Sequence, residues 1–218
     1  GDRIRQWKSE ENIHGVYIDE DSKRYYPSGN LAAHIIGFTG EDNQGLDGIE
    51  KTMEKYLKGV PGKILSEVDA RGRQMPNYQN KRIDPQDGLN VVLTIDETIQ
   101  HHATEALQKA LDDNKVANGG IAIVLDPRNG EILALVSKPD YNLNSPRACP
   151  PGADPATWTG TSQEDIDFLY KTVWRNKAVS DTYEPGSTFK AITSAIAFEE
   201  GGVTPETRTS DFPIELQG

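Results

Sequence analysis

The feature that most constrains the fold is a pair of apolar segments separated by a four-residue turn. "GGIAIVLD" at 119–126 and "EILALVSK" at 131–138 flank Pro127-Arg128-Asn129-Gly130. Pro, Asn and Gly in a turn between β-rich segments predict an antiparallel hairpin. Both segments are apolar at most positions, so the hairpin is predicted to be central in a sheet that is covered on both faces.

Helical patterns lie on both sides of this hairpin. Asp96 can cap a helix over roughly 97–114, and a second helical stretch is predicted near 163–171. A third helix is predicted to begin at Ser187, and Gly201-Gly202 gives it a typical end. Helices and an antiparallel hairpin together indicate the α+β class.

The region before the hairpin has a different character. Residues 1–83 are mixed and irregular, with a strand or hairpin predicted in "GVYIDEDSKRYYP" and a helix over roughly 47–57. Asp-Pro and Asp-Gly breakers in "RIDPQDGLN" mark a domain junction. We therefore predict an N-terminal domain over 1–83 and a second, incomplete domain over 84–218.

The charge and hydropathy of the chain exclude two kinds of partner from this segment. The 218 residues carry a net charge of -11, and Lys and Arg form no stripe, so no nucleic-acid partner is predicted. The apolar runs are all shorter than the ~18 residues that a membrane helix needs. Both ends look like interior sequence, so we expect a portion of a longer protein.

The residues that could hold a metal are too few or wrongly spaced. Cys149 is the single cysteine, so no internal disulfide is possible, and it would need zinc ligands from outside this segment. His101 and His102 are adjacent on a predicted helix and point in different directions. The loop at 40–50 lacks the register of an EF-hand. No metal or cofactor is predicted.

A serine and a lysine stand one helical turn apart after a Pro-Gly turn. In "YEPGSTFK", Ser187 and Lys190 lie about 60° apart around a helix. From Thr188 to Phe198 the lysine is the only charged residue, which predicts a buried helix. Burial would lower the pKa of Lys190, so that its neutral amine could take the hydroxyl proton of Ser187. The alternative is a helix start without chemistry.

The order of several motifs resembles that of the class B penicillin-binding proteins. "NKAVSDT" before "YEPGSTFK" is similar to the active-site start of this family, and "LTIDETIQHHATEAL" with the hairpin is similar to the opening of its transpeptidase domain. "RYYPSGNLAAHIIGFTG" and "GLDGIEKTMEKYLKGVPGK" resemble its N-terminal domain, of the linker or dimerisation type. The division and sporulation members of spore-forming Gram-positive bacteria are the most similar subgroup.

The resemblance implies a D,D-transpeptidase that cross-links peptidoglycan stem peptides, built on an antiparallel sheet sandwiched by helices. Ser187 would be the nucleophile that substrate and β-lactams acylate, Lys190 the proton acceptor, and the backbone N–H of Ser187 one oxyanion donor. Glu184, Gly186 and Trp174 are candidate substrate-binding residues. For Glu184 a structural role at the turn, and for Trp174 ordinary packing, are the alternatives.

The resemblance also implies partners and a location. These are a glycosyltransferase or other cell-wall synthesis protein, and a membrane anchor outside this segment that holds the enzyme on the extracytoplasmic face. Two family motifs, Ser-x-Asn and Lys-Thr-Gly, do not follow Ser187, so this segment by itself is expected to be inactive. A β-lactamase or β-lactam sensor, and a non-catalytic scaffold in a cell-wall complex, remain alternatives.

Overall fold

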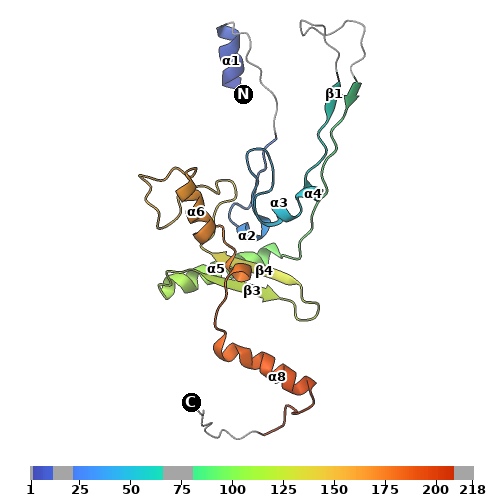
Figure 1. Ribbon diagram of the computed structural model, residues 1–218, viewed down its shortest axis with the longest axis vertical. Helices are drawn as coiled ribbons and strands as arrows, with labels where there is room; N and C mark the ends of the chain where they lie inside the picture. The colour runs from blue at the N-terminus through green and yellow to red at the C-terminus, as the bar shows by residue number, and fades with distance from the viewer. Residues whose placement is uncertain (1, 12–21, 66–80, 209–218) are drawn as a thin grey trace. The chain divides into compact units, whose positions relative to one another are not determined.

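The computed structural model describes residues 2–11, 22–65 and 81–208 (Figure 1). The chain divides into two compact units, Gly1–Ser180 and Asp181–Gly218. Much of the strand predicted in "GVYIDEDSKRYYP" lies outside the described residues, and residues 22–26 of it form no strand. The predicted α+β class is confirmed, because helices accompany two antiparallel strand pairs.

The predicted hairpin is confirmed. Strand β3 (Gly120–Leu125) pairs antiparallel with β4 (Ile132–Lys138), with Gly120 opposite Lys138. Gly130 has φ +78°, a conformation that glycine adopts without strain, and its N–H donates to the carbonyl of Asp126 over 2.8 Å. The turn chemistry that the sequence carries therefore produces the turn.

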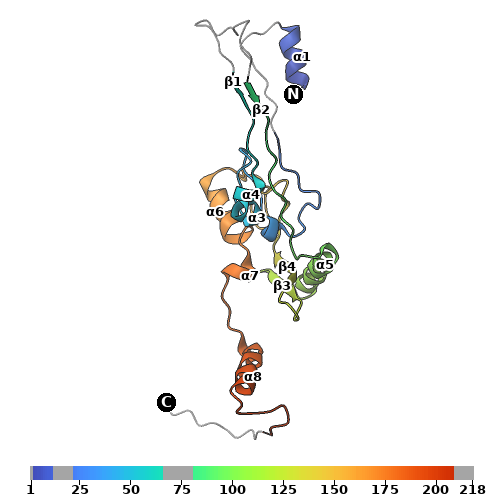
Figure 2. The same ribbon diagram turned by 90° about the vertical axis from the view of Figure 1, so that its right-hand side faces the viewer.

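Helix α5 (Glu97–Asp113) packs against this hairpin, as both views show (Figures 1 and 2). The carboxylate of Asp96 accepts the N–H of Ile99 over 2.9 Å, which is the predicted N-cap. A Cβ at Gly120 would lie 3.2 Å from Leu111 and 3.3 Å from Leu107, so the glycine lets β3 approach the helix closely. One face of the hairpin is thus covered by α5.

The other face of the hairpin is covered only in part. All residues from Ala134 to Lys138 of β4 are buried, as predicted for a central strand. Ile121, Ile123 and Leu125 of β3 are exposed, so the prediction that both faces are covered is wrong for this strand. Helix α7 (Lys177–Ser180), a single turn, contacts both strands, and these three side chains stay exposed beside it among the described residues.

The apolar core of the first unit joins segments from both sides of the predicted domain boundary. Helix α2 (Ala33–Ile36) and its flanks pack against residues 141–143 and against α6 (Gln163–Thr172) with the two residues that follow it. The buried members of this core are Tyr26, Ala33, Phe38, Tyr141, Leu143, Leu169, Val173 and Trp174. The division at residue 83 stays a prediction, and the packing of this core does not follow it.

The remaining elements of the first unit are short. Helix α1 spans Asp2–Glu10, and the helix predicted over 47–57 is split at Met53 into α3 (Gly48–Thr52) and α4 (Glu54–Leu57). Strands β1 (Lys63–Leu65) and β2 (Lys81–Ile83) form the second antiparallel pair (Figure 2).

The second unit contains the helix predicted from Ser187. A 3₁₀ turn, η1 (Gly186–Phe189), leads into α8 (Lys190–Glu199), and Gly201 follows with φ +67°. Phe189, Ile192 and Ile196 are exposed, so the predicted burial of this helix is wrong for the chain as described. Among the described residues of this unit, η1 is the only element that contacts α8, so nothing covers its apolar side.

None of the helices in the described ranges is both long enough and apolar enough to cross a membrane.

Candidate active site

The turn before the predicted nucleophile has the geometry that its sequence requires. Gly186 has φ +55°, in the left-handed region where other residues are strained, and it opens η1. The position that a Cβ would take there meets no atom within 4 Å. The glycine is therefore needed for its backbone conformation and for no close packing in this unit.

Thr188 stabilises the same turn by hydrogen bonds, a role that the sequence did not predict. Its hydroxyl donates to the carbonyl of Pro185 over 2.5 Å, and its N–H donates to the same oxygen over 3.3 Å. A threonine two positions after a Pro-Gly pair is a local signal that could have identified it, because Ser and Thr hydroxyls favour bonds to the backbone of turns and helix starts.

The predicted catalytic pair lies on consecutive turns of one continuous helical path. The N–H of Lys190 donates to the carbonyl of Ser187, which sets the two residues one 3₁₀ turn apart. Both side chains are exposed. No hydrogen bond joins the serine hydroxyl to the ammonium among the described contacts. The backbone brings the two residues together, and their chemical roles stay predictions.

The other predicted site residues have different surroundings. Glu184 is exposed, and no hydrogen bond from it to the turn is present among the described residues. Trp174 belongs to the first unit, where it is 5% exposed and its indole N–H donates to the carbonyl of Pro146 over 2.9 Å. Its ring centroid lies 4.8 Å from that of Phe38. These contacts give Trp174 a packing role, and its role at a cleft stays a prediction.

The segment that precedes the serine is held by several hydrogen bonds that the sequence did not predict. The N–H of Lys177 donates to the hydroxyl of Ser137 over 3.3 Å, and its ammonium donates to the carbonyl of Asn118. The side chain of Asn176 accepts the N–H of Ala178 over 3.2 Å and so begins α7. These contacts are long-range or depend on the exact turn, so no pattern of neighbouring residues predicts them.

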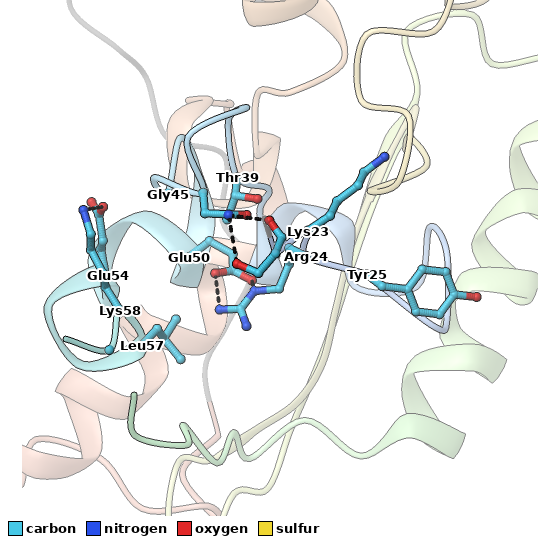
Figure 3. Close-up of a pocket in the computed structure, with 12 residues that line it drawn as sticks. Lys23, Arg24, Tyr25, Thr39, Gly45, Glu50, Glu54, Leu57 and Lys58 are labelled. Atoms are coloured by element: carbon cyan, nitrogen blue, oxygen red, sulfur yellow. Dashed lines mark hydrogen bonds and ion pairs between the residues drawn. The ribbon is translucent and has the colours of Figure 1, made fainter. Parts of the chain in front are cut away.

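A separate pocket of about 440 Å³ lies in the first unit (Figure 3). The pocket is lined by residues 22–25, by the turn at 39–45, and by helices α3 and α4. At its wall, Nε of Arg24 lies 2.8 Å from a carboxylate oxygen of Glu50, and the hydroxyl of Tyr26 donates to the same carboxylate over 3.3 Å. The hydrogen bond to Glu50 raises the pKa of Arg24. None of the predicted site residues lines this pocket.

The described residues contain no cluster of three or more His, Cys, Asp and Glu side chains that could bind a metal. Cys149 is exposed, and His101 pairs with Glu105 one turn along α5 at 3.4 Å.

Two protein-family models match consecutive parts of the chain. The penicillin-binding protein dimerisation domain matches residues 3–93, and the penicillin-binding protein transpeptidase domain matches residues 120–218. The chain belongs to the class B penicillin-binding proteins. The predicted architecture, a dimerisation-type domain followed by part of a transpeptidase domain, is confirmed.

Individual class B penicillin-binding proteins are similar over nearly the whole chain. Stage V sporulation protein D of Bacillus subtilis is 38% identical over 92% of the chain, and the peptidoglycan D,D-transpeptidase FtsI of Escherichia coli is 34% identical over 94%. A Helicobacter pylori penicillin-binding protein, PBP2, in a complex with MreC covers 94% of the chain with a TM-score of 0.62 and 25% identity. The chain spans 28% and 31% of the length of the first two relatives, and 38% of the third.

Proposed function

We propose that the protein to which this chain belongs is an acyl-serine D,D-transpeptidase that cross-links peptidoglycan stem peptides. The observation that carries the proposal is the placement of Ser187 and Lys190 on consecutive turns behind a left-handed Gly186, within the residues that match the transpeptidase domain. The name of the Escherichia coli relative, a peptidoglycan D,D-transpeptidase, supports it.

In the proposed first step, the hydroxyl oxygen of Ser187 attacks the carbonyl carbon of the penultimate D-Ala. Lys190 takes the hydroxyl proton, and the backbone N–H of Ser187 donates to the developing oxyanion. The C–N bond to the terminal D-Ala then breaks, and that residue leaves as a free amine after it receives a proton. An ester between the serine and the stem peptide remains.

In the second step, an amine from a neighbouring stem peptide attacks this ester, and the serine oxygen recovers its proton. A β-lactam would acylate the same oxygen when its ring amide opens. Gly186 sets the turn that presents the serine. We keep Glu184 and Trp174 as proposed substrate-side residues, the second as a wall of the cleft.

We also propose the cellular process, the location and the partners of the protein. We assign the protein to septum or spore-cortex synthesis, on the extracytoplasmic face of the membrane, with an anchor outside this segment and a cell-wall protein such as a glycosyltransferase as partner. The relatives that are named for sporulation and for transpeptidation support this setting, as does the neighbour seen in complex with MreC. We also keep residue 83 as the proposed end of the N-terminal domain.

The test is covalent labelling of the full-length protein with a fluorescent penicillin. We expect label on the wild type, none on Ser187→Ala, and labelling of Lys190→Met that is at least about a hundredfold slower, the lower end of the range for loss of a general base. Ser194→Ala is the matched control, because it removes a hydroxyl from the exposed surface of the same helix. It should label as the wild type does.

Four outcomes would contradict the proposal. An unlabelled wild type, or Ser187→Ala with undiminished label, would exclude the acyl-serine mechanism. Label that is lost within minutes would favour a β-lactamase or sensor. If Ser187→Ala still complements a null strain, the main role is that of a scaffold.

A further inference from the structure

The last part of the first unit before the serine is the segment Val173–Ser180, and Ser187 follows its end by seven positions. The start of this segment packs in the apolar core through Val173 and Trp174, and the N–H of Trp174 donates to the carbonyl of Leu169 over 2.8 Å. Further along, Lys177 donates to Ser137 and Asn118, and Arg175 donates to the carbonyl of Ser180 within the segment over 2.7 Å. Hydrogen bonds to other parts of the first unit therefore add to the packing of this segment.

One of these bonds comes from the N-terminal part of the chain. Nε2 of His34, on α2, lies 2.7 Å from the carbonyl oxygen of Val173, 139 positions away. A carbonyl can only accept, so Nε2 carries the proton of this bond. His34 is 7% exposed, and the ring of Tyr141 meets it edge-on with centroids 5.3 Å apart. The hydroxyl of Tyr141 donates to the carbonyl of Ala33 over 3.4 Å, which fixes α2 beside it.

The pKa of His34 lies below its ordinary value, so its imidazole is neutral at neutral pH. Burial is the main cause that lowers its pKa; the bond to Val173 and the charges of Asp140 and Asp47 oppose it, and that of Lys138 adds to it. Asp140 is itself paired with Lys138 at 2.6 Å, which weakens its pull on the imidazole. Other charged or titratable groups that line the groove beside His34 are Lys51, Tyr170 and Arg175.

We propose that His34 is a positioning residue for acylation, which holds the segment leading to Ser187 through the carbonyl of Val173. This inference rests on the proposed function and adds a residue from the part of the chain that matches the dimerisation domain. The neutral imidazole donates one bond to the backbone at the start of the segment. A change in that part of the chain can thereby alter the segment Val173–Ser180, from which the chain continues to Ser187.

The experiment compares three variants of the full-length protein. His34→Phe keeps a ring but removes the donor, His34→Gln keeps an N–H that can reach Val173, and His101→Gln removes an exposed histidine of α5 as the matched control. We expect the acylation rate constant with a fluorescent penicillin to fall between about tenfold and a hundredfold in His34→Phe, the cost of slightly misplacing a reacting group. His34→Gln should recover most of the rate, and His101→Gln should match the wild type.

A second readout does not depend on acylation. Amide hydrogen exchange of the peptides that span 173–190 should be faster in His34→Phe than in the wild type, with exchange of α5 unchanged. Unaltered exchange there would overturn the inference even if labelling falls, and an unlabelled wild type would overturn the proposed function while leaving this measurement valid.

If His34→Phe does not fold, His34→Asn takes its place, because the amide of Asn is one bond shorter than that of Gln and does not extend as far towards the carbonyl of Val173. Exchange of 173–190 should be faster in His34→Asn than in His34→Gln. Equal exchange in these two variants would overturn the inference.

Discussion

The side chain of Gln100 forms two hydrogen bonds with the backbone of Leu135. Its amide nitrogen donates to the Leu135 carbonyl over 3.0 Å, and its amide oxygen accepts the Leu135 N–H over 2.8 Å. Gln100 is 1% exposed. An amide side chain on α5 thus takes the place of a neighbouring strand at this point of β4, and it satisfies two backbone groups that would otherwise be buried without partners.

Replacing Gln100 by Leu should destabilise the protein by about 2–5 kcal/mol, because each buried backbone group that loses its partner costs about 1–3 kcal/mol. Gln108→Leu is the matched control on the same helix, where the exposed amide donates to Asp112 and to no other group of the described residues. It should change stability by less than about 0.5 kcal/mol. Denaturant unfolding of the full-length variants measures both, and equal losses would show that the Leu135 contacts are unimportant.

Gly37 lies where helix α2 meets the start of α3. Its φ is +74°, and a Cβ at this position would lie 1.9 Å from the carbonyl oxygen of Asp47. Gly37→Ala must therefore move the backbone of one segment, in addition to the conformational strain of about 1–2 kcal/mol that a side chain meets in the left-handed region. We expect a loss of more than about 3 kcal/mol, read as a lower unfolding midpoint.

Gly130→Ala separates the conformational strain of a side chain at positive φ from the steric clash with Asp47. Gly130 has φ +78°, almost the same as Gly37, but a Cβ there meets no atom within 4 Å. This variant should lose only the conformational part, about 1–2 kcal/mol. If both alanine variants lose the same amount, the close approach of Asp47 contributes nothing.

The sequence predicted the elements that depend on neighbouring residues. The β3–β4 hairpin follows from a turn and two apolar strands, and the N-cap of α5 follows from Asp96. Ser187 and Lys190 were found for the same reason, since their spacing and the preceding Gly186 are local. The Ser-x-x-Lys spacing became informative only through the ordered motifs around it.

The contacts between distant segments could not be predicted in this way. The bond between His34 and Val173 joins positions 139 apart, and no pattern near either residue signals the other. The pair of hydrogen bonds between the Gln100 amide and the backbone of Leu135 could not be predicted, because a glutamine on a helix usually faces water. The burial of α8 was inferred from its apolar composition, but burial requires a second surface, and the described residues of its unit provide none.

Asp165 should give a defined pH dependence near the start of α6. The hydroxyl of Thr159, 2.6 Å away, is the main cause that holds the pKa of Asp165 below its usual value near 4, and the hydroxyl of Ser162 adds to it. Because the folded pKa is lower than the unfolded one, this contribution to stability is complete above about pH 4 and is lost as the pH falls through the folded value.

Two variants test this assignment. Asp165→Asn should reduce the loss of stability between about pH 5 and pH 2, measured as the unfolding midpoint against pH. Thr159→Ala should raise the pKa of Asp165 towards its usual value, seen by NMR titration of the carboxyl group. Glu164→Gln, at the neighbouring exposed position, is the control and should leave the pKa of Asp165 low. A pKa that does not respond to Thr159→Ala would contradict the assigned cause.

The ion pair of Arg24 and Glu50 in Figure 3 should contribute a favourable coupling energy to the stability of the fold. The guanidinium contacts both carboxylate oxygens, at 2.8 and 2.9 Å, and the side chains are 41% and 9% exposed. Arg24→Met leaves a nearly buried carboxylate without its cation, whereas Arg24→Met with Glu50→Met leaves no charge. In a double-mutant cycle we expect a coupling energy of about 1–3 kcal/mol, reduced by the solvent that reaches the arginine. Unfolding midpoints of the four proteins give this value, and a coupling near zero would mean that Tyr26 and solvent satisfy Glu50 without Arg24.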